Sequence, residues 1–568
     1  MTSASSAFLD ALQDAGVTHL FVNLGSDHPA FVEAYAKARA TGRPVPDLVT
    51  CPNEMVALSA AHGHALVSGK PQAVIIHVDC GTQALAGAVH NAMRARVPVL
   101  IFAGAAPFTQ EGELLGSRNE FIHWLQDVHD QRGLVRGYMK YDAELRTGRN
   151  IKQMTWRALQ MATSAPQGPV YLMGAREVME EAVPDIANDP ILAQRPFGAT
   201  APRALDAAGV AAIASDLARA KRPLVVTSYV GRNAAAVPLL VELAEKFGAG
   251  VLESAPSAMN FPATHGLYQG NQWNAPVQNE ALASADFVLV LDSDVPWIPL
   301  VNRPASGAIV RHIDVDPLKH DMPLWYIDAT SRHEADAATA LTQLLGAKTP
   351  ASAKAKRAHW EALAKARHDA LAEREKPQAI LTAEYLVARV AACVGEDAIV
   401  LNEGISHYHV ICDGMRRAKP GTLLTSGSSS LGWNGGAAIG VKLANPDAKV
   451  VAMCGDGSYM FSVPSTVHWM ARNYKTPFLQ VVFNNRGWKS PKLSTLAVHP
   501  DGYASRANDL GTRFDPPPDY AGIAAAAGGA LAIKVTKPDE IDEALARAWK
   551  AVEIEKRCAV IDAWLPPA

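Results

Sequence analysis

The sequence predicts an α/β protein with three doubly wound parallel-sheet domains, and two observations support this fold class. Short apolar segments rich in valine, isoleucine and leucine alternate with longer helical segments, as in parallel sheets that are buried on both faces. In addition, a chain of 568 residues is too long for a single hydrophobic core. The apolar segments fall into three groups along the chain, which predicts three domains of similar size.

Each group contains three clear strand candidates. They cover residues 18–25, 72–80 and 98–104 in the first group, 222–228, 286–293 and 308–316 in the second, and 398–404, 449–457 and 478–485 in the third. A proline- and alanine-rich segment at 184–207 reads as a linker, and the charged segment 351–377 reads as a helix that crosses between domains. We therefore expect domains at 1–185, 195–350 and 375–568.

Composition excludes several classes of function. The chain is 49% hydrophobic and 19% charged, with a formal net charge of −3, so there is no electrostatic case for nucleic acid or an anionic membrane. No apolar run approaches the length of a membrane span, and the N-terminus lacks the pattern of a signal peptide. The six cysteines form no CxxC pair, which argues against disulfides and structural zinc. We expect a cytoplasmic enzyme.

The segment Gly455-Asp456-Gly457-Ser458 directly follows the strand candidate 449–454, and the next strand candidate ends at Asn484-Asn485. Neighbouring parallel strands deliver both segments to the same carboxyl edge, where ligands bind in open α/β sheets. The Asp456 carboxylate and the Asn485 carbonyl suit Mg²⁺ or Ca²⁺ shared with phosphate oxygens. The glycines let the backbone approach, and backbone amides at the N-terminus of the helix that follows favour a diphosphate; Gly457 and Ser458 are the candidate residues.

This motif resembles the thiamine diphosphate motif of the acetolactate synthase, pyruvate oxidase and benzoylformate decarboxylase superfamily. The resemblance covers essentially the whole chain and implies pyrimidine-binding, middle and diphosphate-binding domains in that order. It also implies that Mg²⁺ is held by Asp456, Asn485 and the main-chain carbonyl of Gly487. The implied cofactors are thiamine diphosphate and Mg²⁺.

Glu54 lies in a second segment that resembles the family, PDLVTCPNEMVALSAAHGHALVSGKP. The resemblance implies a glutamate that touches the aminopyrimidine ring of the cofactor. A carboxylic acid at the pyrimidine N1′ favours the imino tautomer, whose nitrogen removes the proton from thiazolium C2. The alternative is that Glu54 only stabilises the N-terminus of its helix.

Two further segments match the family by position. The strand candidate at 398–404 leads into Gly404, Ile405 and Ser406, which the resemblance places at the diphosphate. In the glycine-rich segment 425–440, it implies that Leu431 props the cofactor into its bent form and that the Ser429 carbonyl meets the 4′-amino group. Ordinary packing of a glycine-rich helix start explains this segment equally well.

Residues at the strand ends of the first domain are candidates for contact with the substrate. His77 follows a strand and could transfer a proton near neutral pH, as a histidine does in benzoylformate decarboxylase relatives, or it could be an ordinary hydrogen-bonded histidine. The remaining candidates are Ser26, Asp27, His28, Gln83 and Gln126.

The chain also departs from familiar subclasses. It lacks the paired histidines of pyruvate decarboxylases and the leucine–glycine–methionine sequence of acetolactate synthases after the asparagines. Trp488 and Lys489 follow instead and could cover the site, with Lys492 and His499 beyond them; a cationic lid would suit a carboxylate substrate. Some relatives bind FAD or ADP in the middle domain, but Gly231-Arg232-Asn233 is a weak signal, and an empty domain is the preferred interpretation.

The leading hypothesis is a thiamine-diphosphate-dependent carbon–carbon lyase or carboligase for a 2-oxo acid or related carbonyl compound. The alternatives are a flavin-linked oxidase, a lyase of diketones, acyloins or 2-hydroxyacyl compounds, and a non-catalytic regulatory protein, against which Glu54 argues. A Rossmann dehydrogenase is disfavoured because no GxGxxG follows the first strand. The resemblance implies a homodimer at minimum, commonly a homotetramer, in which Glu54 of one chain and Asp456 of its neighbour share a site.

Overall fold

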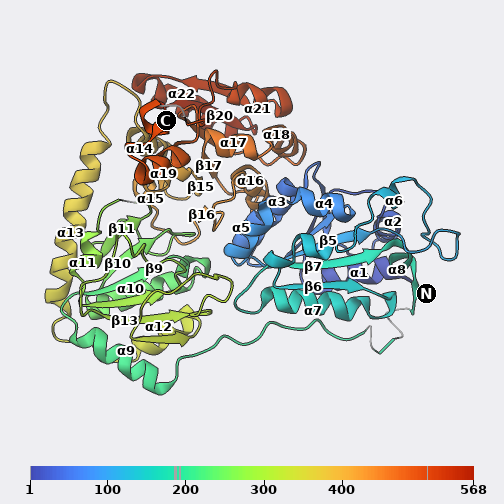
Figure 1. Cartoon of the computed structure of the whole chain (residues 1–568), viewed down its shortest axis with the longest axis horizontal. Coiled ribbons are helices and arrows are strands. Elements are labelled where there is room, and N and C mark those ends of the chain that lie inside the picture. Colours follow the sequence, from blue (N-terminus) through green and yellow to red (C-terminus); the bar gives the residue numbers. More distant parts are fainter. Residues whose placement is uncertain (1, 185–188, 191–192, 275, 508–509) are drawn as a thin grey trace.

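The computed structural model describes residues 2–568 apart from 185–188, 191–192, 275 and 508–509. The chain forms three domains, each built on a six-stranded parallel sheet with helices around it (Figure 1). All nine strand candidates are strands of these sheets, so the predicted fold class is confirmed. No helix among the described residues is both long and apolar enough to cross a membrane.

The first domain has the strand order β3-β2-β4-β5-β7-β6. A separate antiparallel pair, β1 (Thr2–Ser3) with β8 (Ala182–Val183), joins the beginning of the domain to its end. Its strands are β2 (His19–Val22), β3 (Asp47–Thr50), β4 (Gln72–Ile76), β5 (Val99–Ala105), β6 (Tyr141–Leu145) and β7 (Val170–Ala175). Its α-helices are α1 (Ala4–Asp14), α2 (Pro29–Ala40), α3 (Glu54–Ser68), α4 (Val78–Ala84), α5 (Ala88–Arg94), α6 (Ile122–Leu125), α7 (Ile151–Thr163) and α8 (Arg176–Glu180).

The middle domain has the strand order β11-β10-β9-β12-β13-β14, which is the order of dinucleotide-binding folds. Its strands are β9 (Pro223–Thr227), β10 (Gly250–Ser254), β11 (Tyr268–Gln272), β12 (Phe287–Leu291), β13 (Ile309–Asp314) and β14 (Ser331–Glu334). Its helices are α9 (Ala207–Arg219), α10 (Ala236–Phe247), α11 (Glu280–Ser284) and α12 (Ala337–Leu345). The predicted crossing helix is α13 (Ala353–Arg374), which runs along the middle domain toward the third (Figure 1).

The third domain has the strand order β16-β15-β17-β18-β20-β19, the same relative order as the first domain. Its strands are β15 (Ile399–Glu403), β16 (Leu423–Thr425), β17 (Val450–Gly455), β18 (Leu479–Asn484), β19 (Leu531–Val535) and β20 (Ala559–Trp564). Its helices are α14 (Ala383–Val394), α15 (Tyr408–Met415), α16 (Asn434–Ala444), α17 (Asp456–Phe461), α18 (Pro464–Asn473), α19 (Lys489–Val498), α20 (Tyr503–Ala507), α21 (Tyr520–Gly528) and α22 (Ile541–Glu553).

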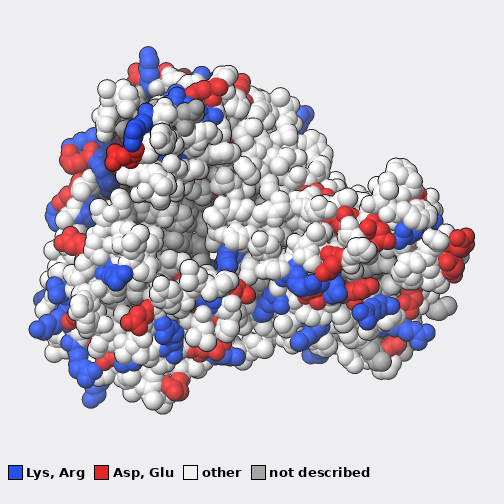
Figure 2. All heavy atoms as spheres, viewed as in Figure 1, with Lys and Arg blue, Asp and Glu red and all other residues white. Residues whose placement is uncertain are grey.

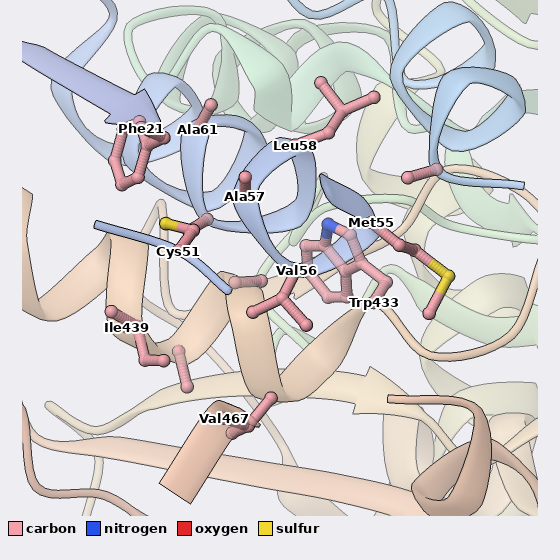
Figure 3. Close-up of a cluster of buried hydrophobic side chains, with 14 of the residues drawn as sticks. Phe21, Cys51, Met55, Val56, Ala57, Leu58, Ala61, Trp433, Ile439 and Val467 are labelled. Carbon is pink, nitrogen blue, oxygen red and sulfur yellow. The ribbon is translucent and has the colours of Figure 1, made fainter. Parts of the chain in front are cut away.

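Helices α3 and α16 join the first domain to the third. Glycines allow the two helices to approach closely: a Cβ atom on Gly440 would lie 1.9 Å from the Ala60 carbonyl oxygen, and one on Gly63 would lie 2.4 Å from that of Ala437. The first turn of α3 contributes Met55 to the same buried cluster as Trp433 (Figure 3). This packing fixes the start of α3, where Glu54 lies, relative to the glycine-rich segment before α16.

Candidate active site

Asp456 and Asn485 lie together at the carboxyl edge of the third sheet. Strand β17 ends at Gly455, and β18 pairs with it in parallel with Gly455 opposite Phe483, so the predicted adjacency is confirmed. The Asp456 carboxylate accepts hydrogen bonds from the backbone amides of Gly457 at 2.7 Å and Gly487 at 3.1 Å. The side-chain carbonyl oxygen of Asn485 is buried and has no hydrogen-bond partner. An oxygen ligand is therefore free at the predicted metal position.

Burial raises the pKa of the Asp456 carboxyl to about 6, although the amides of Gly457 and Gly487 favour its charged form. A cation bound beside the carboxylate would relieve this cost, because an opposite charge stabilises the ionised acid. The electrostatics of the edge thus favour a bound positive charge.

Two glycines let other parts of the chain pack closely against the backbone of this edge. A Cβ atom on Gly457 would lie 2.4 Å from Nε1 of Trp488, and one on Gly487 would lie 2.3 Å from the Thr512 carbonyl oxygen. Trp488 therefore lies directly against Gly457. The amide of Ser458 follows at the start of α17, in a buried position.

Glu403 belongs to the segment that the resemblance places at the diphosphate, but the sequence predicted no role for its side chain; it ends β15, the neighbour of β17. Its carboxylate accepts hydrogen bonds from the amides of Gly432 at 2.5 Å, Trp433 at 3.2 Å and Asn434 at 2.8 Å. Its carbonyl oxygen accepts a bond from the Ser458 hydroxyl at 3.3 Å. Burial raises the pKa of the Glu403 carboxyl to about 7 despite the three amide donors. Glu403 therefore fixes the positions of the predicted cofactor-binding segments relative to one another.

The predicted residues Gly404, Ile405 and Ser406 follow Glu403 directly, in a 3-10 turn. Gly404 is buried, whereas Ile405 and Ser406 are half-buried at the same edge as Asp456. The segment thus presents polar groups at the predicted diphosphate position.

The predicted residues Ser429 and Leu431 flank Ser430, which the first domain holds in place. Asn91 on α5 donates from Nδ2 to the Ser430 carbonyl oxygen at 2.8 Å and accepts from the Ser430 amide at 3.2 Å. Ser429 is exposed and Leu431 half-buried. Asn91 could not be predicted from the sequence, because its partner is 339 residues away.

The first domain places a buried carboxylate at the switch point of its sheet, between β2 and β4. Asp27 follows β2 and binds His77 Nδ1 at 2.5 Å and His28 Nδ1 at 3.0 Å. Its second oxygen accepts from the Val78 amide at 3.2 Å. Gly104 leaves the space for this carboxylate, since a Cβ there would lie 1.7 Å from Asp27 Oδ2. The structure thus brings three predicted residues into one hydrogen-bonded cluster.

In this cluster, the Asp27 carboxylate and the His77 imidazole shift each other's pKa toward the charged form. Burial alone would raise the pKa of Asp27, but the charges and hydrogen bonds of His28 and His77 outweigh it and hold the pKa well below its usual range. The hydrogen bond to Asp27 in turn raises the pKa of His77. His77 is therefore suited to donate a proton near neutral pH.

Ser26 and Gln126 lie at the margin of the cluster. The Ser26 hydroxyl is 3.3 Å from Nε2 of His123, a residue that the sequence analysis missed. Gln126 is 2% exposed, and its side chain acts on His77 as a hydrogen-bond partner that helps to raise the pKa of the imidazole. Gln126 therefore belongs to the surroundings of the Asp27–His77 pair.

Glu54 begins α3, where the Asn53 side chain caps the helix by accepting from the Val56 amide at 3.1 Å. Asn53 is thus the capping residue, and Glu54 is the acidic residue of the first turn, where its charge also favours the helix N-terminus. Gly81 approaches Glu54 so closely that a Cβ would lie 3.2 Å from Glu54 Oε1. Gln83 is exposed and donates to Asp79 at 3.2 Å, and the charge of Asp79 also acts on His77.

Three family models match the chain in order. They describe the N-terminal binding domain (residues 2–134), the central domain (210–344) and the C-terminal binding domain (405–563) of thiamine pyrophosphate enzymes. The chain belongs to the thiamine-diphosphate-dependent enzymes. Its first and third domains are therefore the pyrimidine-binding and diphosphate-binding domains, as the resemblance implied.

Relatives within this family include decarboxylases, synthases and acetyltransferases. The chain is 28% identical over 493 residues to the benzoylformate decarboxylase of Pseudomonas aeruginosa, an alignment that covers 85% of this chain and 86% of the relative. It is 28% identical over 418 residues to the acetolactate synthase isozyme 1 large subunit of Escherichia coli, covering 71% and 68%. The thiamine-diphosphate-dependent 4-hydroxybenzoylformate decarboxylase of Rhodococcus jostii RHA1 has the same fold, with a TM-score of 0.80, 21% identity and full coverage of both chains.

The residues of the diphosphate-binding domain fit thiamine diphosphate and Mg²⁺. Asp456 and the unpartnered oxygen of Asn485 are the hard oxygen donors that Mg²⁺ prefers, and the amides at the start of α17 suit a diphosphate. This donor set has the chemistry that a metal–diphosphate complex requires.

The switch point of the middle domain does not fit the pyrophosphate of FAD. A buried cluster of ion pairs fills it, with carboxylates at the strand ends and a cation from the first domain among its members. Its members are Asp292, Asp294, Asp314, Arg96, Arg232 and Lys319. A cavity of about 980 Å³ adjoins the cluster, but its lining mixes Arg157 with Glu334 and Asp336, so its charge selects no single class of ligand.

Proposed function

We propose that this protein is a thiamine-diphosphate- and Mg²⁺-dependent lyase or carboligase that acts on a 2-oxo acid or a related carbonyl compound. One observation carries the proposal: the first and third domains, which share a strand order, carry complementary groups at the carboxyl edges of their sheets. The third domain has the Asp456 carboxylate, which accepts hydrogen bonds from backbone amides, and the first has the hydrogen-bonded pair of Asp27 and His77. The first is suited to hold a metal–diphosphate complex, and the second to supply a proton to a reacting carbon.

Each group has a defined role in this proposal. Asp456, Asn485 and the Gly487 carbonyl hold Mg²⁺, and the amides of Gly457 and Ser458 bind the diphosphate. Glu54 holds a hydrogen bond to the pyrimidine ring. When bound, the cofactor supplies the carbon nucleophile and the electron sink for breaking or making a bond next to a carbonyl.

His77 moves the proton at the reacting centre. Its Nδ1 is engaged by the Asp27 carboxylate at 2.5 Å, so Nε2 is the atom left to face the substrate. Asp27 fixes the orientation of the ring and raises the pKa of His77, which keeps the imidazole charged closer to neutral pH. Ser26 adds a hydroxyl beside this pair for a polar group of the substrate.

The working enzyme in this proposal is a homodimer or a homotetramer of such dimers, with each site shared between two chains. Among the described residues, no hydrogen bond or ion pair joins Glu54 or the Asp27 cluster to Asp456 or Asn485 within one chain. Large apolar side chains are exposed around both edges, at Phe108, Leu115, Phe121, Leu125, Phe461, Leu493 and Val498. The surface seen over the junction between the first and third domains also carries few charged side chains (Figure 2).

The test is CO₂ release from apo-protein supplied with thiamine diphosphate, Mg²⁺ and a panel of aliphatic and aromatic 2-oxo acids. We expect cofactor-dependent CO₂, with an aldehyde product from a decarboxylase and an acyloin or acetohydroxy acid from a carboligase. If thiamine diphosphate binds but no acid yields CO₂, the proposal of 2-oxo acid chemistry is wrong.

A further inference from the structure

Arg176 is a buried cation at the carboxyl edge of the pyrimidine-binding domain. It is the first residue of α8, directly after β7, and only 8% of its surface is exposed. Asp27, His77 and Arg176 therefore follow β2, β4 and β7 of one parallel sheet and share one edge. Arg176 belongs to none of the motifs recognised in the sequence.

The hydrogen bonds of Arg176 lead toward Ser26. Its Nη1 donates to Asn119 Oδ1 at 2.9 Å and lies 3.2 Å from Nε2 of His123. That same His123 nitrogen is 3.3 Å from the Ser26 hydroxyl. Burial and the charge of Arg176 both lower the pKa of His123. His123 is therefore held neutral, and the positive charge in this part of the site belongs to Arg176.

Among the described residues this charge forms no ion pair with a carboxylate, although it acts over a longer distance on the carboxyl group of Glu180. Arg176 makes no ion pair within 4.0 Å, not even with Glu177 or Glu180 of its own helix, and its Nε is buried without a hydrogen-bond partner. A buried cation left without an anion is costly, because both its charge and its donors have been taken out of water. One oxygen of the Glu177 carboxylate, Oε1, accepts from the Thr109 amide at 2.9 Å, whereas Oε2 is buried without a hydrogen-bond partner.

A second unpartnered polar atom lies at the same edge of the sheet. The Nε2 of His28, beside Asp27, is buried without a partner, as is Arg176 Nε. A ligand with an anionic end would satisfy the guanidinium. The planar guanidinium is matched to a carboxylate, which can accept two of its N–H bonds in parallel.

The strand spacing sets the length of such a ligand. Strand β7 is separated from β4 by β5 alone, so His77 and Arg176 start from strands roughly 10 Å apart at the usual spacing. The long arginine side chain covers part of this distance. A 2-oxo acid whose second carboxylate lies four bonds from the keto carbon covers the rest.

We propose that Arg176 is a specificity-determining residue that binds a second, distal carboxylate of the substrate, so that the enzyme prefers 2-oxo dicarboxylic acids to monocarboxylic ones. The inference rests on the proposed function for the reaction at the keto carbon. It adds the class of substrate, which the motifs of the chain do not give.

The test compares 2-oxoadipate with 2-oxohexanoate, which have the same chain length and differ in the distal carboxylate. We expect the wild-type enzyme to have at least a tenfold higher kcat/KM for 2-oxoadipate. Arg176→Gln should lower the ratio of the two kcat/KM values by roughly 30-fold, mainly through KM of the diacid, as for the loss of a hydrogen bond to a charged group. Arg176→Lys keeps a cation and should retain much of the ratio.

Arg149→Gln is the matched control, since Arg149 is an exposed arginine of the same domain, and it should leave both kcat/KM values unchanged. Equal kcat/KM values for the two acids in the wild type, or an unchanged ratio in Arg176→Gln, would overturn the inference while leaving the proposed function intact.

Equilibrium binding of adipate and hexanoate, measured by calorimetry on the full protein, separates the two claims. If no 2-oxo acid yields CO₂, the proposed function fails. Adipate that binds more tightly than hexanoate only when Arg176 is present would still support the distal-carboxylate site. Equal binding of adipate by wild type and Arg176→Gln would overturn it.

Discussion

The pyrimidine-binding and diphosphate-binding domains share a strand order but carry different chemistry at the same edge. In both six-stranded sheets, a buried carboxylate lies at the carboxyl end of the first strand (β2 or β15), next to the third strand (β4 or β17). In one domain this carboxylate is Asp27, and in the other it is Glu403. The shared topology thus fixes where a carboxylate lies.

The partners of each carboxylate decide what it does. Two histidines hold the pKa of Asp27 far below its usual range, so Asp27 stays charged and orients His77. Glu403 meets only backbone amides, and burial raises its pKa to about 7. The edge of the pyrimidine-binding domain is therefore suited to proton transfer by side chains. The edge of the diphosphate-binding domain is suited to anion and metal binding by backbone amides and oxygen donors.

The largest effect is expected when the two edges are inactivated in separate chains and the chains are mixed. Glu54→Gln and Asp456→Ala homodimers should each be inactive. If a site takes one edge from each chain, mixed dimers contain one intact site and one doubly damaged site. Random mixing should then restore about a quarter of the wild-type CO₂ release, because half the dimers are mixed and each has one of two sites intact. No recovery after verified subunit exchange would place both edges of a site in one chain.

His77→Ala should lower kcat by about 100-fold, the usual contribution of a positioned general acid. Asp27→Asn should move the limb of the pH–rate profile that reports His77 to lower pH, because the hydrogen bond that raises the pKa of His77 is weakened. Stopped-flow pH profiles of the two variants check this. An unmoved limb in Asp27→Asn would show that the pair does not act as a unit.

Glu403→Gln tests the other carboxylate through stability. Because the pKa of Glu403 is raised in the folded protein, the folded state binds the proton more tightly, and stability is lost as pH rises from about 4.5 to about 7. The loss should approach about 1.4 kcal/mol per pH unit in the middle of that window. Denaturant unfolding of the apo-protein should show this slope in wild type, whereas Glu403→Gln should be flatter. If the free energy of unfolding changed with pH by the same amount in wild type and Glu403→Gln, the raised pKa of Glu403 would be refuted.

Asn91→Ala should have the smallest effect, about 1 kcal/mol of stability for the paired bonds to Ser430. The loosened segment 429–431 should also weaken cofactor binding a few-fold. Unfolding and a thiamine diphosphate titration measure the two effects. An unaltered Kd would show that the clamp from α5 is purely structural.

The sequence predicted what depends on local pattern. The apolar strands that end in Gly-Asp-Gly and Asn-Asn can be recognised from the sequence alone. Their order along the chain predicts that they are neighbours in a parallel sheet, so the meeting of Asp456 and Asn485 at one edge was predictable. Asn91, His123 and Arg176 were not, because each is defined by a contact with a residue distant in the chain. Glu403 stood beside the predicted segment, but its role became visible only from the three amides that converge on it.

The central claim is that the diphosphate-binding edge holds the cofactor, whereas Glu54 and the pyrimidine-binding edge perform the proton chemistry. A titration of thiamine diphosphate in the presence of Mg²⁺, with Kd and CO₂ release measured on the same samples, tests it most directly. We predict that Glu54→Gln binds the cofactor within about tenfold of wild type but loses turnover by more than 100-fold, and that Asp456→Ala loses binding itself. Normal turnover in Glu54→Gln, or normal cofactor affinity in Asp456→Ala, would contradict the account.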